Sequence, residues 1–245
     1  MKKIIALSLA VVMSACVFAG CGKKEEKVLT MATNATFPPY EYYEGDKIIG
    51  IDAEIAEKLA EKMGMKLDIQ DTEFGSIITG VQSGKYSMGM AGMTVTDERK
   101  QSVDFSDSYA TGIQSVIVKE GSDIKTIDDL KGHKIGVQQD TTGHIYATDD
   151  YGEENVTPFN KGADAVAALV SGKVDCVIID NEPAKSYVSA NTGLKILDTE
   201  YAVEDYAIAV SKNNPELLKS INAALKELQD DGTIKQIVDK YIEAK

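Results

Sequence analysis

Apolar residues in the first half of the chain alternate between the period of a strand and the period of a helix. The segments KVLTMATNA and KLDIQDTEF are short runs with apolar and β-branched residues, which predicts strands. Between them, FPPYEYYEGDKIIG predicts a loop and hairpin, and IDAEIAEKLAEKMG places Ile55, Leu59 and Met63 on one helical stripe. Asp52 is the expected N-cap of this helix and Gly64 its stop. A helix, FGSIITGVQSG, and a strand, YSMGMAGM, follow, so we expect a mostly parallel sheet covered by helices.

The same alternation starts again at Lys134 and predicts a second α/β unit. Its expected strands are KIGVQ, NVTPFN, VDCVIID and KILD, and its expected helices are TTGHIYATDDYG, KGADAVAALVSG and NEPAKSYVSANTG. The tail predicts one strand and two amphipathic helices, the longer of which begins near Pro215 and packs its apolar face on a lobe. The fold class is therefore α/β with two units.

The two units share a short internal echo. GVQSGKYSMGMAG and ALVSGKVDCVIID both run from a helix end through Ser-Gly-Lys into a strand, with an offset of 171 − 83 = 88 residues between Ser83 and Ser171. The same offset relates Gly92 to Asp180 and places both at the carboxyl ends of equivalent strands, where ligands of open α/β sheets bind. If the units face each other across a cleft, Gly92 and Thr94 approach a ligand from one side and Asp180 from the other.

The N-terminal residues indicate export. MKKIIALSLAVVMSACVFAG begins with two lysines, continues through an apolar run and ends in small residues, a pattern too short for a membrane span. Phe18-Ala19-Gly20-Cys21 resembles the bacterial lipoprotein box, which implies cleavage before Cys21 and lipid attachment to its sulfur. Residues 1–20 are then a signal peptide and residues 21–27 a tether. Met13-Ser14-Ala15-Cys16 is a competing match, and an ordinary secreted protein is the alternative.

Charge and composition exclude several classes of function. Removal of residues 1–20 takes away Lys2 and Lys3, so the net charge changes from -13 to 24 − 39 = -15, which argues against nucleic-acid binding. Cys176 lies in VDCVIID without a partner, so we expect a packed strand residue. The two histidines are not spaced in a metal-binding pattern, and we expect neither a metal nor a cofactor.

Arg99 is the only arginine in the chain, although lysines are plentiful. Its planar fork grips a carboxylate with two parallel hydrogen bonds, which lysine cannot do. A small zwitterion in a closed cleft needs a partner for each charge, because an unpaired buried ion is costly. Arg99 is the natural carboxylate clamp and Asp180 the natural ammonium acceptor. The alternatives are helix capping by Asp180 and a surface ion pair of Arg99 with Asp97, Asp104 or Asp107.

Six motifs, in this order and spacing, resemble the extracellular solute-binding proteins of bacterial polar amino-acid ABC transporters: TFPPYEY, GIDAEIAEKLA, FGSIITGVQSG, MAGMTVTDERKQSVDFSDSY, KGHKIGVQQDTTG and VDCVIIDNEP. The resemblance implies that Arg99 clamps the ligand α-carboxylate and that Asp180 receives the α-amino group. The other ligand-binding residues that it implies are Asn34, Phe37, Phe74, Ala91, Gly92, Thr94, Gln138 and Thr142. Side-chain specificity stays open, because some relatives have an acid at the position of Asn34, the residue at the position of Gln138 varies, and Asp140 replaces the usual glycine.

The resemblance also implies an architecture and a place of action. We expect a two-lobed periplasmic-binding-protein-like fold of type II, with two mixed, mostly parallel sheets. Lobe 1 takes residues 28–112 and 206–245, lobe 2 takes residues 113–205, and crossings near 110–117 and 205–210 form the hinge. We expect a monomer that is mostly open when free, closes on a polar amino acid and docks on an ABC permease. It would be lipid-anchored on the outer face of the cytoplasmic membrane.

Two other functions are left open at this point. Cyclohexadienyl dehydratases resemble these binding proteins, and Glu41, Glu73 or Glu182 would then be the candidates for a general acid. A ligand-binding sensor domain would normally continue into a membrane helix and a signalling module.

Overall fold

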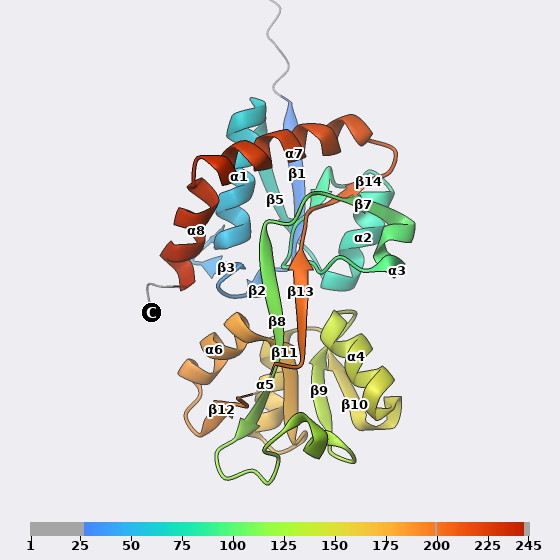
Figure 1. Cartoon of the computed structure of the whole chain (residues 1–245), viewed down its shortest axis with the longest axis vertical. Helices are drawn as coiled ribbons and strands as arrows, with labels where there is room; N and C mark the ends of the chain where they lie inside the picture. The colour runs from blue at the N-terminus through green and yellow to red at the C-terminus, as the bar shows by residue number, and fades with distance from the viewer. Residues whose placement is uncertain (1–26, 199, 243–245) are drawn as a thin grey trace, which may run out of the picture.

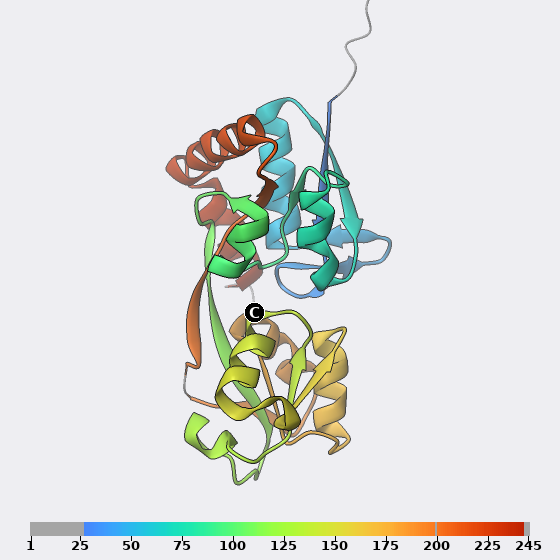
Figure 2. The same ribbon diagram turned by 90° about the vertical axis from the view of Figure 1, so that its right-hand side faces the viewer.

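The computed structural model describes residues 27–198 and 200–242, which form two α/β lobes (Figure 1). One lobe combines the N-terminal and C-terminal parts of the chain, and the middle part forms the other. Two extended strands join the lobes along one side of the molecule (Figure 2). The predicted pair of α/β units, each with its own sheet, is confirmed. The expected export signal, Cys16 and Cys21 lie outside the described residues.

Lobe 1 is built on a sheet with the strand order β5-β1-β6-β14-β7. β1 pairs in parallel with β5 and β6, whereas β14 lies antiparallel between β6 and β7. The predicted hairpin before the first helix is also present, as a small separate sheet of β2, β3 and β4. The strands of this lobe are β1 (Val28–Thr33), β2 (Thr36–Phe37), β3 (Glu41–Glu44), β4 (Lys47–Ile49), β5 (Lys66–Asp71), β6 (Met88–Gly89), β7 (Val103–Phe105) and β14 (Ala209–Ser211).

The helices of lobe 1 pack their apolar stripes into a common core. They are α1 (Ile51–Met63), α2 (Phe74–Gln82), α3 (Asp97–Ser102), α7 (Pro215–Asp230) and α8 (Thr233–Ile242). Ile55 and Leu59 of α1 are fully buried against Leu225 of α7 and Ile237 of α8. Burial of each such side chain contributes about 1.5–3 kcal/mol, so the predicted stripes account for this packing.

Two local predictions for lobe 1 are wrong. Asp52 does not cap α1, because Gly50 is the N-cap and Asp52 lies within the first turn, fully buried. Its Oδ2 accepts hydrogen bonds from the backbone N–H of Gly92 (2.8 Å) and from the hydroxyl of Tyr109 (2.9 Å). The strand expected over YSMGMAGM is shorter, because the chain leaves the sheet after Met88–Gly89 and turns at Gly92, where φ is 52°.

Lobe 2 is built on a sheet with the order β10-β9-β11-β8-β12, and β13 also pairs with β8. β9, β10 and β11 are parallel, and β8 runs antiparallel to β11, β12 and β13. The strands are β8 (Ala110–Lys119), β9 (Ile135–Gln138), β10 (Val156–Phe159), β11 (Cys176–Asp180), β12 (Leu194–Ile196) and β13 (Ala202–Tyr206). The helices are α4 (Thr142–Tyr151), α5 (Gly162–Val170) and α6 (Asn181–Ala190), with short 3-10 helices η1 (Ile127–Leu130) and η2 (Glu153–Asn155).

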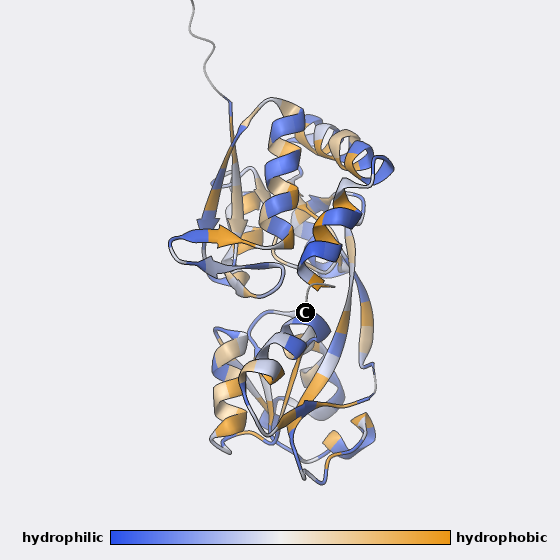
Figure 3. Cartoon of the chain, turned by 90° about the vertical axis from the view of Figure 1, so that its left-hand side faces the viewer, coloured by the Kyte–Doolittle hydropathy of each residue, from blue (hydrophilic) through white to orange (hydrophobic). Residues whose placement is uncertain are grey.

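β11 is buried on both faces of its sheet, which explains its continuous apolar sequence. Cys176 and Ile178 face the core under α4, whereas Val177 and Ile179 face the core under α5 and α6. The expectation that Cys176 is a packed strand residue is confirmed. α5 lies against the second face and is apolar along most of its length (Figure 3).

The internal echo corresponds to a repeated piece of structure. Ser83 ends α2 and Ser171 ends α5, and each serine Oγ donates to a carbonyl oxygen three residues earlier at 3.1 Å. The following glycines, Gly84 and Gly172, have φ of 79° and 75°, a region that favours glycine. Each unit therefore ends its helix in the same way before entering the strand that leads to the cleft.

The two strands that join the lobes are β8 and β13, which pair antiparallel. Glu204 lies opposite Gly112, and Tyr206 lies opposite Ala110. Because alternate residues of a strand share a face, the side chains of Glu204 and Tyr206 point the same way. In the part of the chain that the structure describes, no helix has the length and apolar character needed to cross a membrane.

Candidate solute-binding site

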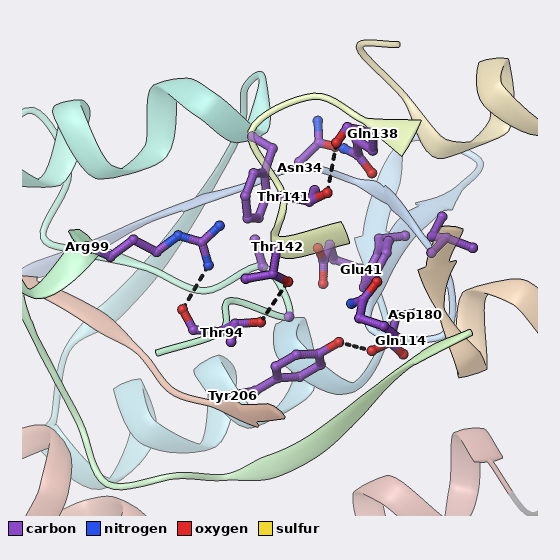
Figure 4. A pocket seen from close by; sticks show the side chains of 15 residues that line it. Asn34, Glu41, Thr94, Arg99, Gln114, Gln138, Thr141, Thr142, Asp180 and Tyr206 are labelled. Atoms are coloured by element: carbon purple, nitrogen blue, oxygen red, sulfur yellow. Dashed lines mark hydrogen bonds between the residues drawn. The ribbon is translucent and has the colours of Figure 1, made fainter. Parts of the chain in front are cut away.

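A cavity with about 430 Å³ of empty space lies between the lobes (Figure 4). The ten residues predicted for the site all line it: Asn34, Phe37, Phe74, Ala91, Gly92, Thr94, Arg99, Gln138, Thr142 and Asp180. The remaining lining residues are Glu41, Gln114, Thr141, Ile179 and Tyr206. Both lobes contribute, so a bound molecule would contact both.

Arg99 reaches from α3 toward the cavity, above Thr94 (Figure 4). Its Nη1 donates to the carbonyl oxygen of Thr94 (2.8 Å), and its Nη2 donates to the carbonyl oxygen of Asp140 (3.1 Å) in the other lobe. Its Cζ lies 5.2 Å from the ring centroid of Phe74. Burial lowers the pKa of Arg99, and the Glu204 carboxylate is the largest charge that opposes this effect.

The alternative of a surface ion pair for Arg99 is wrong. None of the salt bridges formed by residues 27–198 and 200–242 includes this side chain. The guanidinium has five N–H groups, and two hydrogen bonds to carbonyl oxygens fix its plane without neutralising its charge. A half-buried guanidinium that is held in a fixed plane and forms no ion pair is suited to a carboxylate ligand.

Asp180 ends β11 and has two roles at once. Its Oδ1 accepts from the backbone N–H of Glu182 (3.3 Å) and caps α6, and its Oδ2 accepts from the hydroxyl of Tyr206. The side chain also lines the cavity and is 1% exposed. Burial raises the pKa of Asp180 to about 7, against the opposing effect of these two hydrogen bonds. A cation placed beside it would favour the ionised form.

Asn34 and Gln138 connect the lobes at the side of the cavity away from Arg99 (Figure 4). Gln138 Nε2 donates to Asn34 Oδ1 (2.9 Å) and to the carbonyl oxygen of Asn160 (3.4 Å). Asn34 Nδ2 donates to the carbonyl oxygen of Thr72 (2.8 Å). Both donor hydrogens of Gln138 are therefore used within the protein, which leaves its carbonyl oxygen for a ligand.

Of the three candidates for a general acid, Glu41, Glu73 and Glu182, only Glu41 lines this cavity. It is buried, and burial followed by the neighbouring Asp52 charge raises the pKa of Glu41 well above its ordinary value. Glu73 is exposed at the start of α2. Glu182 forms an ion pair with Lys185, with Oε1 and Nζ 2.6 Å apart.

Gly92 lies where no larger residue fits. A Cβ atom at this position would be 2.9 Å from the ring of Phe37 and 3.3 Å from the ring of Tyr206, and the positive φ disfavours other residues. The buried Asp52 carboxylate accepts a hydrogen bond from the backbone N–H of Gly92. The carboxylate expected to cap a helix instead fixes the loop that borders the cavity.

Asp140 lies in the loop between β9 and α4 of lobe 2, where it faces lobe 1. It adopts φ of 63°, which fits the glycine expected in this loop and is unfavourable for aspartate. Its carboxylate packs on Gly75 at the start of α2 in lobe 1, where a Cβ atom would lie 2.1 Å from Asp140 Oδ2. Asp140 therefore contacts lobe 1 through both its side chain and its carbonyl oxygen.

The hinge strands supply cavity residues that the sequence analysis missed. Gln114 of β8 and Tyr206 of β13 line the cavity, and Glu204 lies behind it. Gly112 leaves space for the contact between Tyr206 and Asp180, because a Cβ atom there would lie 2.4 Å from the Tyr206 hydroxyl and 2.6 Å from Asp180 Oδ2. The sequence signal for them is a polar side chain among apolar residues, at Gln114 in β8 and, two residues apart, at Glu204 and Tyr206 in β13.

The sequence model of the bacterial extracellular solute-binding proteins, family 3, matches residues 29–244. The chain belongs to this family. The arginine-binding extracellular protein ArtP of Bacillus subtilis (strain 168) is 35% identical, over 97% of this chain and 95% of its own length. The predicted resemblance is confirmed.

Solved structures show the same two-lobed fold. A structure described as an ancestral arginine-binding protein bound to glutamine has a TM-score of 0.84 and 41% identity, covering 89% of this chain and 98% of that chain. The ancestral amino acid-binding protein AncCDT-1, described as a precursor of cyclohexadienyl dehydratase, has a TM-score of 0.81 and 32% identity, covering 87% and 95%. The predicted fold class is confirmed.

Proposed function

We propose that this solute-binding protein captures a polar L-amino acid between its lobes and delivers it to an ABC importer. The observation that carries the proposal is the presence of a half-buried guanidinium and a buried carboxylate, Arg99 and Asp180, on the lining of one cavity. A zwitterion offers each of them an opposite charge. Thr94 and Thr142 supply hydroxyls from the two lobes, and Phe37 and Phe74 supply aromatic faces for the aliphatic part.

The ligand side chain is expected to carry hydrogen-bond donors. Two groups at the end of the cavity near Asn34 can accept from it, namely the carbonyl oxygen of Gln138 and Oε2 of Glu41. Oε2 of Glu41 is buried and has no hydrogen-bond partner among the described residues. Arginine and glutamine both provide N–H donors, and these are the amino acids named for two of the similar proteins.

Delivery requires that the protein stays near its permease. A lipid on Cys21, or on Cys16 if cleavage occurs earlier, would tether the domain to the outer face of the cytoplasmic membrane. Closure of the lobes would then present a surface that differs between the free and loaded protein. Metabolic labelling with a radioactive fatty acid, with Cys21→Ala and Cys16→Ala compared, would identify the modified cysteine.

A thermal-shift screen of the purified protein tests the ligand class. The twenty amino acids, cystine and ornithine are added one at a time, because a ligand that binds the folded state raises the melting temperature. We expect an increase with one or a few polar amino acids and none with their α-amides, which lack the carboxylate. The absence of a shift with every compound would reject the proposal.

The enzymatic alternative has one observation in its favour. Glu41 is a buried carboxyl with a raised pKa on the lining of the cavity, as a general acid requires, and AncCDT-1 is described as a dehydratase precursor. Incubation with prephenate or arogenate, followed by measurement of product, decides between the two. We propose binding without catalysis, and turnover that is lost in Glu41→Gln would overturn this.

A further inference from the structure

Glu204 is a buried carboxylate without a role in the binding scheme above. It lies in the hinge strand β13, is 5% exposed, and stands directly behind two threonines that line the cavity. Its opposite residue on β8 is Gly112, which has no side chain to compete for the space.

One oxygen of Glu204 collects hydrogen bonds from both lobes and from the hinge. Oε2 accepts from Thr94 Oγ1 of lobe 1 (3.1 Å), from Thr142 Oγ1 of lobe 2 (3.0 Å) and from Gln114 Nε2 of β8 (3.0 Å). The two threonine oxygens are 3.5 Å apart. Because a hydroxyl has a single hydrogen, donation to Glu204 fixes the orientation of both hydroxyls.

The charge of Glu204 also acts on the site. It is the largest charge opposing the effect of burial on Arg99. After burial, it is the main cause that raises the pKa of Tyr146, on α4, to about 12. Its second oxygen, Oε1, is buried and accepts no hydrogen bond from the described residues. The carboxylate therefore stands close to the guanidinium without forming an ion pair with it.

We propose that Glu204 is a positioning residue of the ligand site, which acts through Thr94 and Thr142. Its Oε2 holds one hydroxyl from each lobe at a common point, so that the two meet the ligand in a fixed geometry when the lobes close. This inference rests on the proposed amino-acid site for its effect on affinity, whereas the restraint on the two threonines exists without a ligand.

The first test compares Glu204→Ala with Glu204→Gln by calorimetry, using L-arginine and L-glutamine as probes. The amide oxygen of glutamine can accept from both hydroxyls, so Glu204→Gln should bind within about threefold of wild type or more tightly, whereas Glu204→Ala should bind at least about tenfold more weakly. Asp205→Asn is the control, because Asp205 is the next residue of β13 and is exposed. An equal loss in both Glu204 variants, or no loss in Glu204→Ala, overturns the proposal.

A double-mutant cycle with Thr142→Val separates positioning from a general effect on the fold. If Glu204 acts through this hydroxyl, Glu204→Ala should cost much less affinity in the Thr142→Val background than in wild type. Additive losses would mean that the two residues act independently, which contradicts the inference.

Hydrogen exchange of the ligand-free proteins provides a test that needs no ligand. Peptides covering residues 91–96 and 139–146 should exchange faster in Glu204→Ala than in wild type, and as in wild type in Glu204→Gln and Asp205→Asn. Unchanged exchange in Glu204→Ala overturns the positioning role even if amino acids bind. Faster exchange together with no binding by wild type would reject the proposed ligand class and retain the positioning role.

Discussion

Replacement of Asp180 by asparagine should separate ligand binding from the stability of the free protein. The carboxylate is 1% exposed, and burial raises its pKa from 3.8 to about 7. In the unfolded chain the carboxyl group ionises near pH 3.8. As the pH rises above this value, the buried Asp180 lowers the free energy of unfolding progressively, and this loss of stability is complete above pH 7. At about 1.4 kcal/mol per pH unit, this cost is about 4 kcal/mol.

Asparagine removes this cost but keeps only part of the hydrogen bonding. Its amide oxygen can accept from the Tyr206 hydroxyl or from the N–H of Glu182, and its NH₂ group cannot accept from the other, which costs about 1–2 kcal/mol. We expect a net gain of about 2 kcal/mol at pH 8, or about 4–8 °C in melting temperature for a chain of this size. The gain should nearly vanish at pH 5, where wild-type Asp180 is mostly protonated in the folded state.

Ligand binding by Asp180→Asn should change in the opposite direction. Loss of one partner of a buried ion pair costs about 3–5 kcal/mol, so affinity should fall by about a hundredfold or more. Calorimetric titration and thermal melts at pH 8 and pH 5 measure both effects, with the exposed Asp205→Asn as control. Wild-type affinity would show that the ammonium group binds elsewhere. A lower melting temperature at pH 8 would show that burial does not disfavour this carboxylate.

Three further predictions concern Arg99, Asp140 and the pH dependence of the site. Arg99→Lys keeps the charge but loses the fork, so binding should weaken by about 2 kcal/mol, and unchanged affinity by calorimetry would rule out the clamp. Asp140→Gly should raise the free energy of unfolding by about 1 kcal/mol, because glycine adopts the φ of 63° at this position without strain. The same change should weaken ligand binding, because it removes the contact of the Asp140 side chain with α2. A less stable variant in urea titrations would contradict the first expectation. In the wild type, ligand affinity should fall by up to about tenfold per pH unit as the pH drops below 7, because the ligand ammonium group needs an ionised Asp180. An affinity that stays constant in calorimetric titrations between pH 5.5 and 8 would argue against Asp180 as the ammonium acceptor.

The sequence predicted the parts of the site that depend on strand ends and on rare residue types. Arg99 stood out as the only arginine, and the echo related Gly92 to Asp180, because both units use the same helix-to-strand connection. The place of Asp52 was missed because an acid at the start of a helix has the same sequence pattern whether it caps the helix or binds a distant loop. Only the tertiary fold brings Gly92 to it.

The hinge residues were missed for a related reason. Gln114, Glu204 and Tyr206 belong to two strands that read as crossings between lobes, and polar residues in such strands normally face solvent. Their alternation became informative only when the register of β8 and β13 placed them on the face toward the cavity. A pairing between segments about ninety residues apart cannot be read from local periodicity.

The same geometry explains why an amino-acid ligand should favour tighter closure of the lobes. Closure removes the remaining water from around Arg99 and Asp180, and neither side chain forms an ion pair within the described residues. Burial of a charge without a counter-ion costs several kcal/mol, and an amino acid removes this cost at both ends at once. The ligand therefore stabilises the closed form more than the open form, and the difference drives closure. On this reasoning Asp180→Asn, which has one charge fewer to bury, should be more closed in the ligand-free state than wild type. X-ray scattering of the two free proteins would measure this, and a larger radius of gyration for the variant would contradict it.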